Sequence, residues 1–398
     1  MRPLNVFRET GAVMGLRFRN VLMRPLLPAI MVTGFLSVVL VMVSMLSIGR
    51  GMNRTYANTG GAGVAMALSD GALVESQSSL SGSDVQALES EPGVVKGTAG
   101  PLASPELVTT IELPKQGSGV TSDVVLRGVT EGGYRLHPQV HMITGRMYKS
   151  GIHQIIIGRQ AAREYRGLRV GAVVHTDGVD WTVTGVFASN GNIHESEIWT
   201  DLPGLQNAQH EANRYSAVYL QVATPRDYAL FASAVRKDPR LAVQVQTEKG
   251  YYANIASGVA DVFLSVSLAL ATLMALGAVV GAINLMYVHL ASRIGDIATL
   301  RAVGFRRLSV FCAVLCEGLS FGLTGGVIGG LIAYAAFDGA QAGTIFFGGA
   351  TQVDFQLSVT AGQLVGGLVF ALTMGFIGGL FPAIRAARLP VAKALRET

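Results

Sequence analysis

Few residues in this chain have a type and spacing suited to chemistry, and the histidines are the first of them. His137 and His141 are one helical turn apart, a spacing that suits two metal ligands, but Pro138 and the nearby glycines predict a loop. We therefore expect solvated or hydrogen-bonded histidines and no metal site. The other histidines, including His194, are scattered, and residues 192–197 read as a polar loop that can touch a ligand or partner.

The cysteines and serines, which could act as nucleophiles, give no stronger indication of a catalytic site. Cys312 and Cys316 lie one helical turn apart inside an apolar run, where packing explains them and further metal ligands are lacking. The long polar region between residues 49 and 254 contains no cysteine, so it must fold without disulfides. The sequence has no G-x-S-x-G pattern, which argues against a serine hydrolase. An autonomous membrane enzyme is the least supported class.

Long apolar runs define the elements around these residues. Half of the residues are hydrophobic and only 14% are charged. A helix needs about 20 apolar residues to cross a bilayer. Four runs reach this length, at residues 26–48, 262–292, 308–337 and 355–384. The first is longer than the apolar core of a cleavable signal, so we expect a signal-anchor helix.

Basic residues predict the orientation of these spans. They precede the first span, separate the second from the third and follow the fourth, whereas residues 338–354 contain none. The positive-inside rule places both termini and residues 293–307 in the cytoplasm. The polar region 49–254 and the short loop 338–354 then face outside. The net charge of +5 is explained by the inner membrane surface, so no nucleic-acid partner is expected.

The segments flanking the spans have patterns of their own. Residues 1–25 mix apolar and basic side chains and predict an interfacial elbow helix on the inner leaflet. Residues 255–292 are longer than a bilayer requires, which predicts a stalk that continues the second span outward past Tyr251 and Tyr252. Residues 385–398 form a cytoplasmic tail.

The exported region predicts an α/β domain in two parts. Ser83 to Gln86 has the form of a capping box that starts a short helix, followed by a strand from Val94. Later a helix over residues 227–237, with Pro225 in its first turn, precedes a strand over residues 241–246. We expect both ends to form one porter-like subdomain.

The middle of this region is rich in β-branched and aromatic residues separated by Gly and Asp turns. Strands are predicted at residues 124–129, 154–157, 172–175 and 181–187. We place an inserted β-rich subdomain at about residues 125–213. The fold class is therefore an α+β membrane protein, with four transmembrane helices and a large extracytoplasmic α/β domain between the first and second.

The third span carries an acidic residue and a stripe of glycines. A charge such as Glu317 at bilayer depth costs about 2.5–3.5 kcal/mol, so we expect an ion pair or hydrogen bond, with proton relay as the alternative. Glycines that recur every four residues let helices approach closely in lipid. They can serve dimerisation of two chains or packing within one chain. The stripe comprises Gly318, Gly322, Gly326 and Gly330.

Three segments resemble the FtsX/MacB-type permeases of ABC transporters, the type VII or mechanotransmission class that includes LolC and LolE. Residues 16–25 (LRFRNVLMRP) are similar to the family's elbow before its first span. Residues 293–304, followed by Glu317-Gly318, look like its R-x-x-E-I-x-x-L-R-A-x-G…E-G signature, with Asp296 in place of Glu. Residues 382–396 look like its closing P-A-x-R-A-A-R-x-x-P-x-x-A-L-R pattern.

The resemblance implies that the loop at residues 293–307 is a coupling helix for an ATPase. The residues it assigns to coupling are Arg293, Asp296, Thr299, Leu300, Arg301 and Gly304. The sequence contains no G-x-x-x-x-G-K-[ST] loop, so ATP and Mg²⁺ are expected on a separate ATPase subunit, present in two copies, and no cofactor on this chain. The other implied partners are membrane lipid, a second permease chain, identical or paralogous, and a periplasmic adaptor or membrane-fusion protein.

The implied function is that of a non-catalytic permease subunit in a bacterial inner membrane. ATP hydrolysis by its partner would move the exported domain and drive export or extraction of an amphiphilic substrate, such as a lipid, lipoprotein, peptide or drug. The alternative is an FtsX-like signalling scaffold that regulates an extracytoplasmic cell-wall hydrolase. The size of the exported region favours transport.

Overall fold

The computed structural model describes residues 26–61, 63–98, 100–117, 119–345 and 352–389, and the chain divides into two compact units. The membrane unit comprises residues 1–50, 260–340 and 357–398. The α/β unit comprises residues 51–259 and 341–356. The predicted elbow at residues 1–25 and the end of the closing motif, from residue 390, lie outside the described residues.

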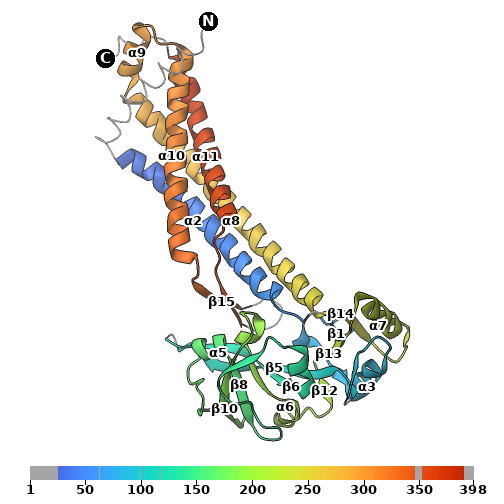
Figure 1. Cartoon of the computed structure of the whole chain (residues 1–398). Helices are drawn as coiled ribbons and strands as arrows, with labels where there is room; N and C mark the ends of the chain where they lie inside the picture. Colours follow the sequence, from blue (N-terminus) through green and yellow to red (C-terminus); the bar gives the residue numbers. More distant parts are fainter. Residues whose placement is uncertain (1–25, 62, 99, 118, 346–351, 390–398) are drawn as a thin grey trace. The chain divides into compact units, whose positions relative to one another are not determined.

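Four helices among the described residues are long and apolar enough to cross a membrane, which confirms the four predicted spans. They are α2 (Leu26–Ala57), α8 (Glu248–Ala291), α10 (Arg307–Phe337) and α11 (Ala361–Arg388). A short helix, α9 (Ile294–Ala302), joins α8 to α10, and α10 and α11 lie side by side (Figure 1). The helix of the second span begins at Glu248 and includes Tyr251 and Tyr252.

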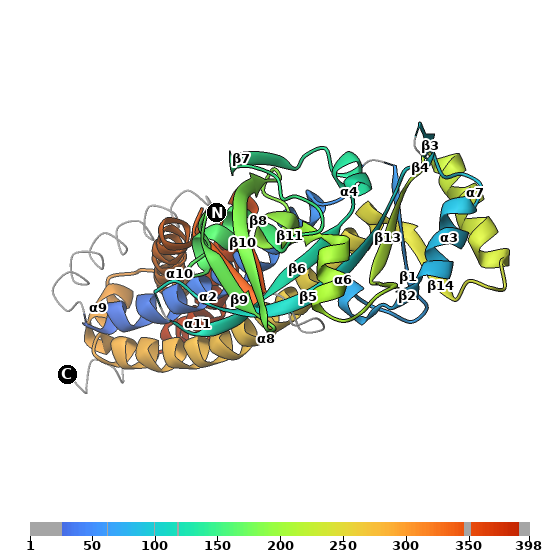
Figure 2. The ribbon, with the colours of Figure 1, turned by 90° about the horizontal axis from the view of Figure 1, so that it is seen from below.

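One ten-stranded sheet organises the α/β unit (Figure 2). Its order is β14-β1-β13-β5-β6-β11-β8-β10-β7, with β9 paired to β10. The pairs β6/β11 and β8/β10 are parallel and the others are antiparallel. The strands are β1 (Val64–Ser69), β5 (Ala103–Pro114), β6 (Thr121–Val129), β7 (His141–Gly145), β8 (Gln154–Gly158), β9 (Val173–Thr176), β10 (Val179–Ala188), β11 (Ile198–Asp201), β13 (Ala217–Gln221) and β14 (Val243–Thr247).

Among the described residues, three apolar cores lie on this sheet, the smallest around Phe187 and Trp199. The first joins β1, β13 and β14 to α3 (Gly82–Ser90) and α7 (Pro225–Lys237), so both ends of the region build it. The second joins β5, β6 and β8–β11 to α5 (Arg159–Glu164) and α6 (Leu202–Ala208). It begins at Leu107, ahead of the expected start near residue 125, because the long strand β5 pairs with both β13 and β6.

Of the helices and strands predicted in the exported region, some are confirmed and others are wrong. The helix over residues 227–237 is confirmed as α7, where Thr224 is the N-cap and Pro225 opens the first turn. The capping box of α3 is wrong by two residues, because Ser81 and Asp84 form it, not Ser83 and Gln86. The strand predicted from Val94 is also wrong, since Val94 makes only an isolated bridge before β3 (Lys96–Gly97), which pairs with β4 (Gly100–Pro101).

The predicted loop at residues 338–354 contains a hairpin of β15 (Gln341–Ile345) and β16 (Gln352–Gln356), which groups with the α/β unit. Strand β16 lies against β6 and η2, a connection between distant parts of the chain that local patterns do not reveal. The remaining elements are η1 (Glu75–Gln77), β2 (Leu80–Ser81), α4 (Glu131–Leu136), η2 (Ile193–Ser196) and β12 (Arg214–Tyr215).

Candidate functional site

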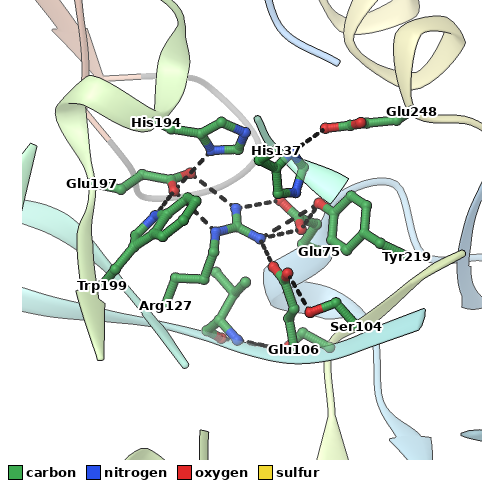
Figure 3. Close-up of polar contacts among 12 residues, drawn as sticks. Glu75, Ser104, Glu106, Arg127, His137, His194, Glu197, Trp199, Tyr219 and Glu248 are labelled. Atoms are coloured by element: carbon green, nitrogen blue, oxygen red, sulfur yellow. Dashed lines mark hydrogen bonds and ion pairs between the residues drawn. The ribbon is translucent and has the colours of Figure 1, made fainter. Parts of the chain in front are cut away.

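A buried network of charges surrounds Arg127 on β6 (Figure 3). Its guanidinium donates to Glu75 on η1 at 2.8 and 3.0 Å, and to Glu106 on β5 at 3.0 Å. It also forms a two-pronged contact with Glu197, at 3.0 and 2.9 Å. The Arg127 side chain is only 2% exposed. One guanidinium thus joins three elements far apart in the sequence.

Burial and charge shift the pKa values of this network in opposite directions. Burial alone would raise the pKa of Glu197, but Arg127 and His194 outweigh it and hold that pKa well below its usual range. Burial raises the pKa of Glu106 to about 7, despite the opposing attraction of Arg127. Three carboxyl groups around one guanidinium carry excess negative charge, so one of them takes up a proton most readily, and Glu106 is that group.

A second cluster adjoins this network, and it corrects two predictions about the histidines. His137, which follows α4, is buried, although we expected a solvated or hydrogen-bonded side chain. Residues 192–197 are not a polar loop at the surface but a buried segment around η2 that contains His194. The two histidine rings lie 5.0 Å apart by centroid, and Glu248 completes the cluster. His141, by contrast, is exposed as expected.

Burial is the largest single influence on the pKa values of His137, His194 and Glu248. Burial, assisted by His194 and Arg127, holds the pKa of His137 well below its usual range. Burial also opposes a charge on His194, but the Glu197 carboxylate outweighs it and raises the pKa. Burial raises the pKa of Glu248.

The ends of the two helices that leave the α/β unit are anchored to these clusters. The Tyr251 hydroxyl on α8 accepts from the Glu75 backbone N–H at 3.3 Å, and the Tyr252 ring meets the His194 ring edge-on. Thr59, just after α2, accepts from the Ile193 N–H of η2 at 3.2 Å. The first turns of α8 and the residues that follow α2 are therefore built into the core of this unit.

In the membrane unit, α9 has one face packed and one face exposed. Ile297 and Ala298 are buried in the apolar core, whereas Thr299 and Val303 are exposed, Val303 by 76%. The residues assigned to coupling all lie on or beside α9. Arg293 is its N-cap, Asp296, Thr299, Leu300 and Arg301 belong to the helix, and Gly304 follows its C-cap.

Two of these residues have roles within the chain that the sequence did not suggest. Arg301 donates to the Leu389 carbonyl at 2.6 Å and to the Ala387 carbonyl at 3.3 Å, so it caps the C-terminal end of α11. Gly304 has φ +110°, a conformation that favours glycine, and its position ends α9. The packed face of α9 thereby holds the helix to the end of the fourth span.

The intramembrane residue Glu317 faces His289 of α8 at 3.1 Å. This contact lies within the chain, involves a histidine of another span, and is an ion pair when His289 is protonated. This partner was not foreseen, because His289 and Glu317 lie on different spans and no local pattern links them.

The glycine stripe of α10 faces α11 of the same chain. A Cβ atom added at Gly318 would lie 2.7 Å from the Gly375 carbonyl oxygen, and one at Gly322 would lie 2.5 Å from that of Ala371. Gly326 meets Ala371 and Leu368, and Gly330 meets Leu364. Of the two uses left open, packing within one chain is the one these glycines serve. A second pair, Gly325 and Gly329, meets α2 and was missed.

The chain matches two protein-family models. Residues 29–238 match the MacB-like periplasmic core domain, and residues 268–391 match the FtsX-like permease C-terminal domain. The chain belongs to the FtsX/MacB-type permeases of ABC transporters. A comparison with curated proteins found no match.

Solved structures of related domains are more distant. The extracellular domain of the ABC-type transporter YknZ from Gram-positive bacteria is 18% identical, with a TM-score of 0.35, over 46% of this chain and 100% of that one. The periplasmic region of MacB from Actinobacillus actinomycetemcomitans is 13% identical, with a TM-score of 0.35, over 49% of this chain and 93% of that one. The family assignment rests on the two family models.

Proposed function

We propose that this permease couples ATP hydrolysis by a separate ABC ATPase to movement of its extracytoplasmic α/β domain. The movement would drive export or extraction of an amphiphilic substrate, such as a lipid, lipoprotein, peptide or drug. The permease would itself be non-catalytic. Membership of the ABC permease family supports the ATPase partner.

The observation that carries the proposal is the continuity of α8. This helix runs without a break from Glu248 to Ala291, and three residues later α9 begins. Within the α/β unit, buried hydrogen bonds hold its first residue, Glu248, and Tyr251, and a ring contact with His194 holds Tyr252. A displacement of α9 can therefore be transmitted along one continuous helix to the exported domain.

The proposed orientation follows from the basic residues. Both termini and α9 lie in the cytoplasm of a bacterium, and the four spans cross its inner membrane. Two ATPase subunits dock on two permease chains, which are identical or paralogous. A periplasmic adaptor is a further partner. The glycine stripe of α10 does not join the two chains, because α11 already covers it.

The exposed face of α9 is the proposed contact for the ATPase. Val303 is a large apolar residue held out from the membrane unit at the end of the helix. An exposed apolar side chain within a basic segment suits a partner that offers an apolar groove with an acidic rim. Arg301 is a poorer probe of docking, since it caps α11.

The test is co-purification from native membranes, using a tagged chain and a mild detergent. The wild-type chain should retain a subunit with a phosphate-binding loop and show ATPase activity. Val303→Asp should lose both, while Val120→Asp, an exposed site in the α/β unit, should keep both. Retention of the ATPase by Val303→Asp would refute docking at this face. Recovery of a cell-wall hydrolase instead of an adaptor or a cargo would favour the signalling alternative.

A further inference from the structure

Three buried side chains from distant parts of the sequence converge in the α/β unit. His137 follows α4, His194 lies in η2, and Glu248 is the first residue of α8. One ligand atom of each lies within 4.8 Å of the other two, and no side chain of the three is more than 1% exposed. Figure 3 shows the two rings and the carboxylate turned toward one another.

The atoms that converge can be identified from their neighbours. Glu248 Oε2 accepts from the Gly61 N–H at 2.6 Å, while Oε1 faces His137 Nδ1 at 3.5 Å. His194 Nδ1 lies 3.0 Å from Glu197 Oε2. Within the described part of the chain, His137 Nδ1, His194 Nε2 and Glu248 Oε1 have no hydrogen-bond partner. A buried polar group in this state costs about 1–3 kcal/mol.

The neighbouring network sets up His194 as a ligand. The same oxygen of Glu197 also accepts from Trp199 Nε1 at 2.7 Å and from Arg127 Nε at 3.0 Å. It can only accept, so His194 Nδ1 carries a hydrogen toward it, and Nε2 is left for another occupant. A carboxylate that orients a histidine in this way is the usual support of a metal-binding imidazole.

Charge balance favours a cation at this place. Four carboxyl groups but only one guanidinium belong to the two adjoining clusters drawn in Figure 3. Arg127 offsets a single negative charge, and it contacts three of the four carboxyl groups but not Glu248. A divalent ion beside Glu248 would offset the excess where the guanidinium does not reach. The carboxyl groups are Glu75, Glu106, Glu197 and Glu248.

We propose that His137, His194 and Glu248 bind one divalent transition-metal ion, for which Zn²⁺ best suits two imidazoles and one carboxylate. Bonds of about 2.0–2.2 Å place tetrahedral ligand atoms about 3.3–3.6 Å apart. The His137–Glu248 contact of 3.5 Å is already close to this spacing, and His194 closes the rest by a small side-chain movement.

The ion would have a structural role. Because its three ligands are buried, a substrate has no direct approach to it, and hydrolytic chemistry is not proposed. It would fix the first residue of α8 to α4 and η2, the elements of the α/β unit that hold the other two ligands. A metal there would therefore set how firmly the proposed transmission helix is held by the exported domain. This last consequence rests on the proposed function, whereas metal binding itself does not.

The test uses the full chain in detergent, carrying an affinity tag without histidines. After dialysis against EDTA and its removal, Zn²⁺ bound per chain is measured by mass spectrometry of the metal, and Co²⁺ is added as a spectroscopic probe. The wild type should bind one equivalent and give the intense visible absorption of tetrahedral Co²⁺. Glu248→Gln, His137→Gln and His194→Gln should each weaken binding at least tenfold. His141→Gln, an exposed histidine, should not.

A second measurement guards against variants that fail to fold. Zn²⁺ should raise the unfolding temperature of the wild type, because a ligand that binds only the folded state stabilises it. Glu248→Gln, whose amide oxygen can still accept from Gly61, should fold but lose this shift. Substoichiometric binding by the wild type, or equal binding by wild type and Glu248→Gln, would overturn the proposal. Loss of binding only when Cys312 and Cys316 are replaced would do the same.

Discussion

Each of the two units of this permease has its own kind of internal stabilisation, and the two kinds differ. In the membrane unit, α10 and α11 approach so closely that a single added carbon at Gly322 or Gly375 would come within 2.5 Å of a backbone oxygen. In the α/β unit, the core contains a guanidinium with three carboxyl groups. Lipid provides little hydrophobic drive between helices, so close backbone packing must supply the attraction. A water-facing domain can instead bury charges, provided that they are paired.

This difference predicts two kinds of vulnerability. The membrane unit should tolerate apolar substitutions at the exposed positions of its spans but not an extra methyl group at the α10–α11 contact. The α/β unit should tolerate small changes of volume but not the loss of the positive charge of Arg127. The chain offers a native probe for each unit, because both tryptophans lie in the α/β unit and both cysteines lie on α10.

The largest effect is expected from Arg127→Met. Removing one partner of a buried ion pair typically costs about 3–5 kcal/mol, and here three carboxyl groups would lose their shared cation. Urea unfolding of the full chain in detergent, followed by tryptophan fluorescence, should show a lower midpoint. Reaction of the cysteines with a thiol dye should change much less.

The matched control is Arg240→Met, which removes an exposed partner of Asp238. Solvent screens this pair, so no measurable change of the midpoint is expected. A midpoint for Arg127→Met equal to that of the control would show that the carboxyl groups are not balanced by Arg127, and the contrast between the units would fail.

The next largest effect is a dependence of the stability of the α/β unit on pH, caused by Glu106. Its pKa of about 7 lies above the ordinary pKa of 4.5 for a glutamate, so the proton favours the folded state. The stabilisation is complete below pH 4.5 and is lost as the pH rises through about 7. By linkage the loss is on the order of 3 kcal/mol. The titratable and charged groups that face Glu106 are Arg127, Glu75, Tyr134, Tyr148 and Tyr219.

Glu106→Gln tests this directly, because the amide resembles the protonated carboxyl group and does not titrate. Tryptophan-monitored urea midpoints should fall less steeply between pH 5 and pH 8 in this variant than in the wild type. At pH 8 the variant should be the more stable protein. Parallel pH profiles for the two proteins would assign the dependence to other groups.

The spans and the order of the exported region were predictable because their signals are local. Four apolar runs suffice to place α2, α8, α10 and α11, and the sequence around Pro225 contains the start of α7. The family signature likewise places α9 between two spans. Each of these features depends on neighbours within a few residues, where composition and periodicity are informative.

The buried clusters could not be predicted, since their members are distant in sequence and ordinary in type. Glu75 and Glu197 are separated by more than a hundred positions, and both would pass for surface residues. His137 looked like part of a loop, which it is, but nothing local shows that the loop is buried by η2 and α8. The only faint signal was the concentration of polar residues at 192–197.

A smaller effect, now in the membrane unit, is expected from Gly375→Ala. The new Cβ atom would lie 2.5 Å from the Gly318 carbonyl oxygen, and overpacking of this kind costs about 1–3 kcal/mol. The thiol-dye signal from Cys312 and Cys316 should appear at a lower temperature. Gly366→Ala, on the same helix, meets nothing within 4 Å and should behave as the wild type. Equal behaviour of the two variants would mean that close backbone contact does not hold the spans together.

The smallest loss of stability is expected from an exposed helix cap in the α/β unit, which can be compared with the buried charges of the same unit. Ser81 caps α3 by accepting from the Asp84 N–H at 3.3 Å, and Asp84 accepts from the Ser81 N–H at 2.8 Å. Ser81→Ala should cost about 1 kcal/mol in the tryptophan-monitored urea midpoint, the usual value of an N-cap. Ser83→Ala should cost almost nothing, because Ser83 lies inside the first turn and only contacts the Ser81 hydroxyl. Equal losses would place the start of the helix at Ser83, as local sequence had suggested. A loss for Ser81→Ala as large as that for Arg127→Met would show that the buried charges are no more important to this unit than one exposed cap.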